Sequence, residues 1–188
     1  MDSSKDLNKR SDFWTNLFKT PTEKNVLEDI LVSMPLFKEL DSKHIKFLMQ
    51  IIHHRVYESN EFIFSQGDPG IALYIVKEGE VKIVYKDEFD KLHELANLLK
   101  GDFFGELAML NDDVRSASAV AVKESSLAVI FKPDLDEFIE KYPRKGIQIL
   151  RGISQITAIR LRKLNEELAV LYNKGIFNNE EISNEQIK

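Results

Sequence analysis

The central part of the chain, from about Arg55 to Phe131, is a series of short apolar segments separated by turn residues. Each segment is rich in Val, Ile, Tyr and Phe and is followed by Gly, Asp, Asn or Pro. β-Branched and aromatic residues favour strands, and these turn residues interrupt them. Short strands at this spacing are typical of an antiparallel roll or barrel. The predicted strands are Arg55–Tyr57, Phe62–Phe64, Ala72–Lys77, Glu80–Lys86, Leu92–Leu99 and Ser118–Phe131, the last of them expected in two pieces.

On the N-terminal side of this region, apolar residues recur at helical spacing. The runs Phe13–Phe18, Val26–Met34 and Ile45–Ile52 each place apolar residues three and four positions apart, which predicts helices. Asp41 stands just before the last of these runs and offers its side chain as an N-cap. The adjacent histidines of His53–His54 are expected at the end of that helix.

A second helical part follows the strands. Leu135–Ile139 predicts a short helix, and a long helix is expected from about Arg144 to Asn173. Between Leu161 and Leu171 the leucines follow a seven-residue repeat, which favours a homodimer through this helix. The predicted fold class is α+β, an antiparallel, jelly-roll-like β-roll of about eight strands with N-terminal helices and a long C-terminal helix. We divide the chain into an N-terminal helical extension (1–25), a main domain that includes the C-terminal helix (26–173) and a flexible polar tail (174–188).

The composition argues against several classes of protein. No stretch approaches the roughly 20 apolar residues of a membrane-spanning helix, and the polar start MDSSKDLNKR lacks the apolar core of a signal peptide. We therefore expect a cytoplasmic protein with no membrane partner. The chain has no cysteine, which removes disulfides and thiolate chemistry. Its net charge of −5, with both signs mixed, disfavours a broad nucleic-acid surface but is compatible with a small anionic ligand.

Neither a metal centre nor a catalytic set is evident in the sequence. His53, His54 and His93 lack the His-x-His and Glu spacing of metal-binding β-barrels, so no metal site is predicted. No Ser/His/Asp arrangement, Walker loop or carboxylate pair stands out. We therefore expect that the protein is not an enzyme and needs no cofactor.

The segment FFGELAMLNDDVRSASAV, Phe103–Val120, carries an isolated carboxylate and an isolated guanidinium in an otherwise apolar stretch. Gly105 lets the backbone approach a ligand closely, and the residues after it look like one helical turn, whose N–H groups favour an anion. Arg115 supplies a planar, permanently charged fork for two phosphate oxygens. Glu106 would repel a phosphate but fits a sugar hydroxyl. The pair indicates a nucleotide pocket, and a Glu106–Arg115 salt bridge that closes a loop is the alternative.

Three motifs in order along the chain resemble one known family. FGELAML…RSASAVA is similar to the phosphate-binding cassette of cyclic nucleotide-binding domains, the family of the bacterial catabolite activator, the kinase regulatory subunits and cyclic-nucleotide-gated channels. GDPGIALYIVKEGEV (Gly67–Val81) resembles the family's glycine-punctuated strand pair, and MPLFKEL (Met34–Leu40) resembles its opening segment. The resemblance covers about Val26 to Tyr172.

The resemblance implies a role for individual residues. Glu106 matches the glutamate that accepts the ribose 2′-hydroxyl, and Arg115 matches the arginine on the cyclic phosphate. Ser116 and Ala117 match the pair that donates to the phosphate. The implied ligand-binding residues are Gly105, Glu106, Leu107, Ala108, Arg115, Ser116 and Ala117, with Ile83, Leu95 and Leu98 toward the base, for which ordinary core packing is the alternative.

Some positions depart from the family pattern or leave a choice open. Phe64 stands where a smaller β-branched residue is usual, which we interpret as a packing variation. Similar domains that favour cGMP carry a threonine at the position of Ser116. The serine found here does not decide between cAMP and cGMP. Asp112 and Asp113 would oppose a phosphate if they turned inward, but carboxylates at a loop tip are more often solvated.

The resemblance assigns the mechanism to the long C-terminal helix. In the family this helix moves toward the roll when nucleotide binds and covers the base. Its apolar stripe therefore has two possible docking sites, the occupied pocket and a second subunit. The alternative is a helix that packs permanently on the domain. The lid residues expected from this helix are Leu164, Leu168, Leu171 and Tyr172.

These expectations together describe a stand-alone regulatory protein that binds cAMP or cGMP and signals to a separate, unidentified effector protein through movement of its C-terminal helix. The short segment after Asn173 leaves no room for a winged-helix domain, so direct DNA binding is not expected. Two alternatives stay open, a scaffold protein that keeps the fold without a ligand and a binder of cyclic dinucleotides.

Overall fold

The computed structural model describes residues 21–111 and 113–173. The helix predicted at Phe13–Phe18, the polar tail after Asn173 and the side chain of Asp112 lie outside this part of the chain. The domain boundaries drawn from the sequence therefore stay a prediction.

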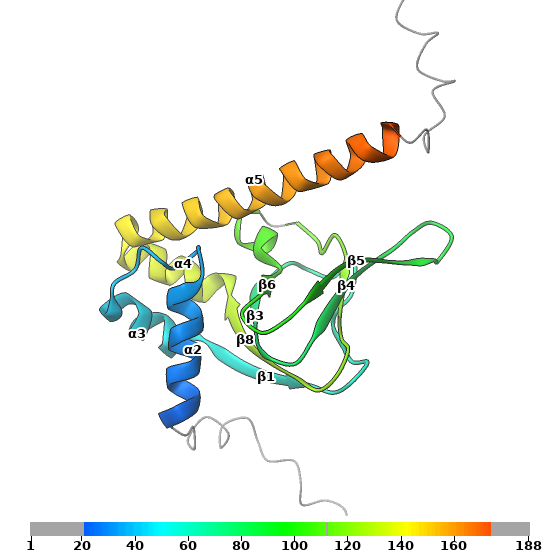
Figure 1. Ribbon diagram of the computed structural model, residues 1–188. Coiled ribbons are helices and arrows are strands. Elements are labelled where there is room, and N and C mark those ends of the chain that lie inside the picture. Colours follow the sequence, from blue (N-terminus) through cyan, green and yellow to red (C-terminus); the bar gives the residue numbers. More distant parts are fainter. Residues whose placement is uncertain (1–20, 112, 174–188) are drawn as a thin grey trace, which may run out of the picture.

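Helices, strands and again helices follow one another in the predicted order (Figure 1). As expected, Asp41 caps helix α3 by accepting hydrogen bonds from the backbone N–H groups of Lys43 and His44. The helical elements are α2 (Pro21–Ser33), α3 (Ser42–Ile51), the 3₁₀ turn η1 (Glu106–Met109), α4 (Lys132–Lys141) and α5 (Pro143–Asn173). The strands are β1 (His53–Tyr57), β2 (Phe62–Phe64), β3 (Ala72–Glu78), β4 (Val81–Lys86), β5 (Leu92–Leu98), β6 (Phe103–Phe104), β7 (Ser118–Ala121) and β8 (Ser125–Phe131).

The strands form two antiparallel four-stranded sheets, ordered β1-β8-β3-β6 and β2-β7-β4-β5. Helices precede and follow the strands of this β-roll along the chain, and α5 is the longest of them. This arrangement confirms the fold class predicted from the sequence.

Strand β3 contributes to two separate cores. Leu73 and Ile75 belong to the core between the first sheet and the helices, whereas Tyr74 and Val76 belong to the core between the two sheets. The division follows from the period of two in a strand, where successive side chains point to opposite faces. Both faces of β3 are thus covered, and the second core extends toward the segment that carries the site.

Two elements differ from the sequence expectation. The pair His53–His54 begins strand β1 instead of ending a helix, because both residues pair with β8. Phe103–Phe104 forms a short additional strand that pairs with β3. In both cases pairing with an inner strand outweighs the local pattern. The stretch Ser118–Phe131 divides into β7 and β8, as expected.

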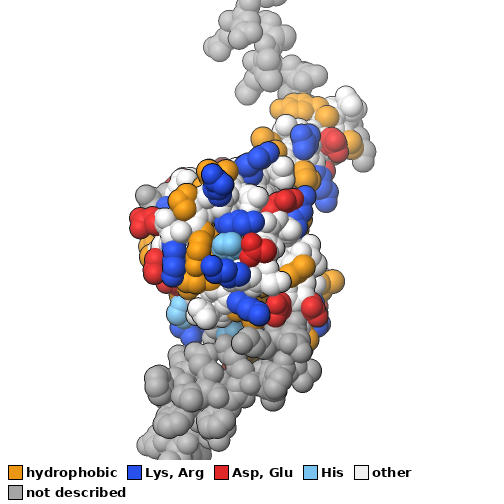
Figure 2. All heavy atoms as spheres, turned by 90° about the vertical axis from the view of Figure 1, so that its left-hand side faces the viewer, with side chains coloured by type: hydrophobic (Ala, Val, Ile, Leu, Met, Phe, Trp, Pro, Cys, Tyr) orange, Lys and Arg blue, Asp and Glu red, His pale blue; other side chains and the backbone are white. Residues whose placement is uncertain are grey.

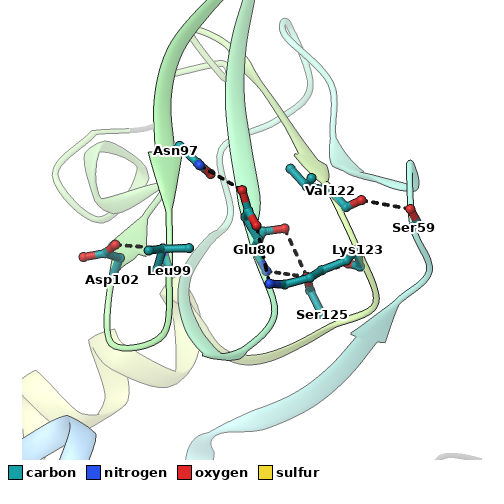
Figure 3. A network of polar contacts seen from close by, with 8 residues as sticks. All are labelled: Ser59, Glu80, Asn97, Leu99, Asp102, Val122, Lys123 and Ser125. Carbon is teal, nitrogen blue, oxygen red and sulfur yellow. Dashed lines mark hydrogen bonds and ion pairs between the residues drawn. The ribbon is translucent and has the colours of Figure 1, made fainter.

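A polar network joins several strand ends of the roll (Figure 3). Glu80 lies at its centre: its backbone N–H donates to Ser125 Oγ at 3.0 Å, and its Oε1 accepts from Asn97 Nδ2 at 2.8 Å. Its Oε2 lies 3.4 Å from Lys123 Nζ. These residues connect the start of β4 with β5 and with the turn between β7 and β8, so the network fixes the strand pair β4–β5 against its neighbours.

Helix α5 is packed on the domain along its first part only. Ile149, Gly152 and Ile153 are buried, and a Cβ at Gly152 would come within 2.8 Å of Leu36 Cα. From Ala158 onward the side chains are mostly exposed. Figure 1 shows this second half running above the roll, with its end directed away from the strands. The second half therefore depends on few contacts for its position.

The face formed by the helices carries mixed charge, in keeping with the composition. Figure 2 shows lysine and arginine side chains interspersed with aspartate and glutamate there. Within residues 21–111 and 113–173, no helix is both long and apolar enough to cross a membrane.

Candidate functional site

A cleft of about 460 Å³ lies between the second sheet, the segment from β6 to β7 and helix α5. Of the predicted ligand-binding residues, Leu98 does not line it and instead packs against the core between the two sheets. The predicted residues that the fold does bring together around the cleft are Ile83, Leu95, Gly105, Glu106, Leu107, Ala108, Arg115, Ser116 and Ala117.

Arg115 is a nearly buried cation in the wall of this cleft, only 6% exposed. Its Nη2 donates to the backbone oxygen of Ala72 at 2.9 Å, and its Nη1 donates to that of Gly105 at 3.3 Å. Its Nε is buried and has no hydrogen-bond partner in the described part of the chain. The guanidinium is therefore fixed in place but keeps donors that no described residue uses.

No described carboxylate forms an ion pair with Arg115. Glu106 pairs with another residue, and Asp113 accepts at Oδ1 from the backbone N–H of Val114 at 2.8 Å. Burial lowers the pKa of Arg115, but arginine starts from a value so high that the side chain stays charged near neutral pH. The alternative of a Glu106–Arg115 salt bridge is therefore wrong.

Glu106, only 5% exposed, forms its ion pair with Arg160 of helix α5. Arg160 also donates from Nη2 to the backbone oxygen of Phe103 at 3.0 Å, and its guanidinium carbon lies 5.1 Å from the centre of the Phe103 ring. Arg160 thus ties α5 to both β6 and η1. The bond to Glu106 uses Oε1, and Oε2 accepts no hydrogen bond from a described residue.

The family model of the cyclic nucleotide-binding domain matches residues 54–142, which build both sheets and the segment that carries Glu106 and Arg115. The chain contains a cyclic nucleotide-binding domain. This confirms the resemblance seen in the sequence motifs. Helix α5 lies outside the matched residues.

Known relatives of the cyclic nucleotide-binding domain include receptors and kinase subunits. The cyclic AMP receptor protein of Thermus thermophilus is 34% identical over 137 residues, which are 73% of this chain and 62% of that protein. The crystal structure of the Thermus thermophilus catabolite activator protein matches with a TM-score of 0.66 at 33% identity, over 73% of this chain and 63% of that one. The regulatory domain of Toxoplasma gondii PKA, solved with cAMP, matches with a TM-score of 0.61 at 27% identity, over 64% of this chain and 46% of that one.

A further relative is named for a different ligand. The c-di-GMP responsive global regulator CLP of Xanthomonas campestris gives a TM-score of 0.61 at 25% identity, over 70% of this chain and 65% of that one. The chain spans less than two thirds of the length of each of these relatives.

The expected lid residues of the domain do not all reach the cleft. Leu164 lines it, whereas Leu168, Leu171 and Tyr172 are not among its lining residues. The side chain of Leu164 is also 52% exposed, so it covers the cleft only partly. The lid role of the four residues stays a prediction.

Two residues of the cleft that contact its charged groups, Arg160 and Phe64, were not predicted from the sequence. Arg160 lies one helical turn before Leu164, so the spacing of four that links the two could have placed it on the same helix face. Phe64 was interpreted as a packing variation, but its ring lies under the guanidinium of Arg115, 4.2 Å from Cζ to ring centre. The other unpredicted lining residues are Gly70, Phe104, Asn111, Asp113 and Val114.

Gly105 has a conformation and surroundings that suit no other residue. Its φ is +75°, and an added Cβ would lie 2.7 Å from Arg115 Nη1 and 2.9 Å from the oxygen of Ala72. Left-handed backbone costs a residue with a Cβ about 1 kcal/mol, and crowding of a packed site costs about as much again. The close approach of Gly105 is what lets Arg115 bond to the backbone.

Gly105→Ala is therefore expected to lower the free energy of unfolding by about 2 kcal/mol, measured by urea denaturation. Gly101→Ala is the matched control, because Gly101 has a φ of +91° with no atom within 4 Å of the added Cβ. It carries the backbone strain without the crowding and should lose about half as much. Equal losses in the two variants would contradict the proposed crowding of Arg115.

Among residues 21–111 and 113–173, no group of three or more His, Cys, Asp and Glu side chains is arranged to hold a metal ion. The cleft holds a cation with spare donors at one place and a carboxylate with a spare oxygen at another.

Proposed function

We propose that the chain is a regulatory module that binds a cyclic mononucleotide, cAMP or cGMP, and signals to a separate protein through helix α5. The observation that carries this proposal is Arg115, a nearly buried cation in a cleft with an unpaired Nε. A buried donor without a partner costs about 1–3 kcal/mol. An anion in the cleft would remove that cost, and a phosphate with two oxygens matches the fork of a guanidinium.

The second polar group of the cleft supports a ribose. Glu106 already pairs with Arg160, so its charge is compensated, and its Oε2 is available to accept from a hydroxyl group. A carboxylate has room for several donors at once. One cation for the phosphate, one carboxylate for the sugar and the apolar side chains of Ile83 and Leu95 toward the base together suit a nucleotide.

Helix α5 is the element best suited to report the ligand. It contributes Arg160 and Leu164 to the cleft, while its second half is mostly exposed. A ligand shifts a helix between two positions only if it binds one of them more tightly. Contacts of α5 with the occupied cleft would supply this difference, which is why we propose movement of α5 as the output.

The partners of the module are proposals of the same kind. The exposed leucines Leu161, Leu164 and Leu168 suit a homodimer through α5, and an effector protein would read the position of the helix. The expectations of no DNA binding, no catalysis and a cytoplasmic location stay predictions, because the chain spans 62% of the Thermus receptor.

Calorimetry with cAMP, cGMP and a cyclic dinucleotide tests the proposal, with adenosine as the control ligand that lacks a phosphate. We expect saturable heat with at least one cyclic mononucleotide and measurable but much weaker binding with adenosine. If none of the cyclic ligands gives heat or raises the melting temperature, the module proposal is wrong and the scaffold alternative replaces it.

The cyclic dinucleotide alternative has one specific observation in its favour, the match to the c-di-GMP responsive regulator of Xanthomonas campestris. Binding of that ligand alone in the same experiment would decide for this alternative.

A further inference from the structure

The buried charge of Arg115 is stabilised by aromatic rings in place of a carboxylate. Its guanidinium carbon lies 4.2 Å from the centre of the Phe64 ring and 5.5 Å from that of Tyr74. A cation over the face of an aromatic ring is attracted by the ring's quadrupole, and the attraction grows when both groups leave water. Arg115 is only 6% exposed and Phe64 is partly buried, so both groups are at least partly withdrawn from water.

The rings form a platform that spans both sheets. Phe64 comes from β2, Tyr74 from β3 and Phe104 from β6. Tyr74 and Phe104 stack with centres 5.2 Å apart and planes 11° from parallel, and Phe64 lies 5.5 Å and 5.8 Å from them. Because Tyr74 and Phe104 are buried in the core between the sheets, Phe64 rests on a rigid support.

A ring and a carboxylate would stabilise Arg115 in different ways. A carboxylate takes the N–H donors at the edge of the guanidinium, which are the donors that a phosphate needs. A ring contacts the face of the guanidinium and leaves every N–H donor unused. In Arg115, Nη2 and Nη1 donate to the backbone oxygens of Ala72 and Gly105, and the Nε–H has no described partner.

We propose that Phe64 is a positioning residue that holds Arg115 buried and charged while it leaves the donor edge available to a phosphate. The proposal rests on the proposed function, since it concerns the same cleft. Through Arg115, Phe64 sets the preference for ligands with a phosphate over the corresponding nucleosides. A smaller aliphatic residue would fill space there without attracting the cation.

Calorimetry on Phe64→Leu and Phe64→Tyr tests this assignment with cAMP and adenosine as probes. Phe64→Leu should bind cAMP roughly three- to thirty-fold more weakly, as the loss of one desolvated cation–ring contact predicts. Phe64→Tyr keeps the ring and should restore the affinity, and adenosine binding should not change in either variant. Phe62→Leu is the control on the same strand, because Phe62 is exposed and makes no described contact with Arg115. Equal effects on cAMP and adenosine would reduce Phe64 to a packing residue and overturn the proposal.

A measurement without ligand separates this proposal from the proposed function. In the ¹⁵N–¹H spectrum, the Nε–H signal of Arg115 should be shielded by the ring in the wild type and in Phe64→Tyr, and should lose this shielding in Phe64→Leu. If no cyclic nucleotide binds but the shielding changes as stated, the proposed function fails and the positioning of Arg115 by Phe64 holds. An unchanged signal in Phe64→Leu would show that Phe64 does not position Arg115.

Discussion

Replacing Arg115 by alanine is expected to weaken the binding of cAMP by about 2–5 kcal/mol, the cost of losing one partner of a desolvated charge pair. The structure gives the reason: Arg115 is the cleft cation whose Nε has no described partner, so much of its bonding capacity is left for a ligand. Titration calorimetry measures the effect directly. Adenosine should bind the variant and the wild type alike, because it has no phosphate for Arg115 to contact.

Two further variants separate binding from folding. Arg115 also bonds to Ala72 and Gly105, so alanine removes internal contacts as well. Arg115→Lys keeps the charge but loses the planar fork, and its affinity should fall between those of the wild type and the alanine variant. Arg162→Ala removes an exposed arginine of α5 and should leave affinity unchanged. If Arg115→Ala remains folded and binds cAMP as the wild type does, the phosphate site is elsewhere.

The local part of the site follows from the sequence alone. Gly105, Glu106 and Arg115 lie within one short segment and all line the cleft, although the guanidinium of Arg115 is held there by a hydrogen bond to Ala72 of β3. The strands were also predictable, because their β-branched runs end at turn residues. Only the short β6 and the start of β1 were missed, where the deciding partner is another strand.

The remaining part of the site depends on tertiary packing. Arg160 reaches Glu106 because α5 crosses the roll at a particular place, and no local pattern fixes that crossing. Leu95 and Leu98 were both expected at the base, but only Leu95 lines the cleft. The ladder shifts there: Glu94 pairs with Val84 and Ala96 with Ile83, which leaves Leu95 as the extra residue of a bulge. A bulge re-aims a side chain and is not visible in residue spacing.

Arg160→Ala is expected to release the second half of α5 from the roll. Removing one partner of a fully buried ion pair costs about 3–5 kcal/mol, because the other charge is left in a poor environment. Here the group left behind, Glu106, is 5% exposed, while the Arg160 side chain is 46% exposed. Solvent screening of Arg160 reduces this cost, so we expect the free energy that holds the second half of α5 on the roll to fall by about 2–4 kcal/mol. Hydrogen exchange of residues 158–173 measures it, with faster exchange in Arg160→Ala than in Arg162→Ala.

The pair itself is tested by adding Glu106→Gln, which removes the buried charge that Arg160 compensates. If the ion pair holds α5 in place, the double variant should exchange no faster than Arg160→Ala alone, since neighbours that act through one contact are not additive. Strictly additive effects would show that Arg160 acts through Phe103, its other partner, and not through Glu106.

With the coupling present, a hydroxyl bound at Glu106 acts on the same carboxylate that anchors α5. We therefore expect cAMP to slow hydrogen exchange of residues 158–173 in the wild type but not in Arg160→Ala.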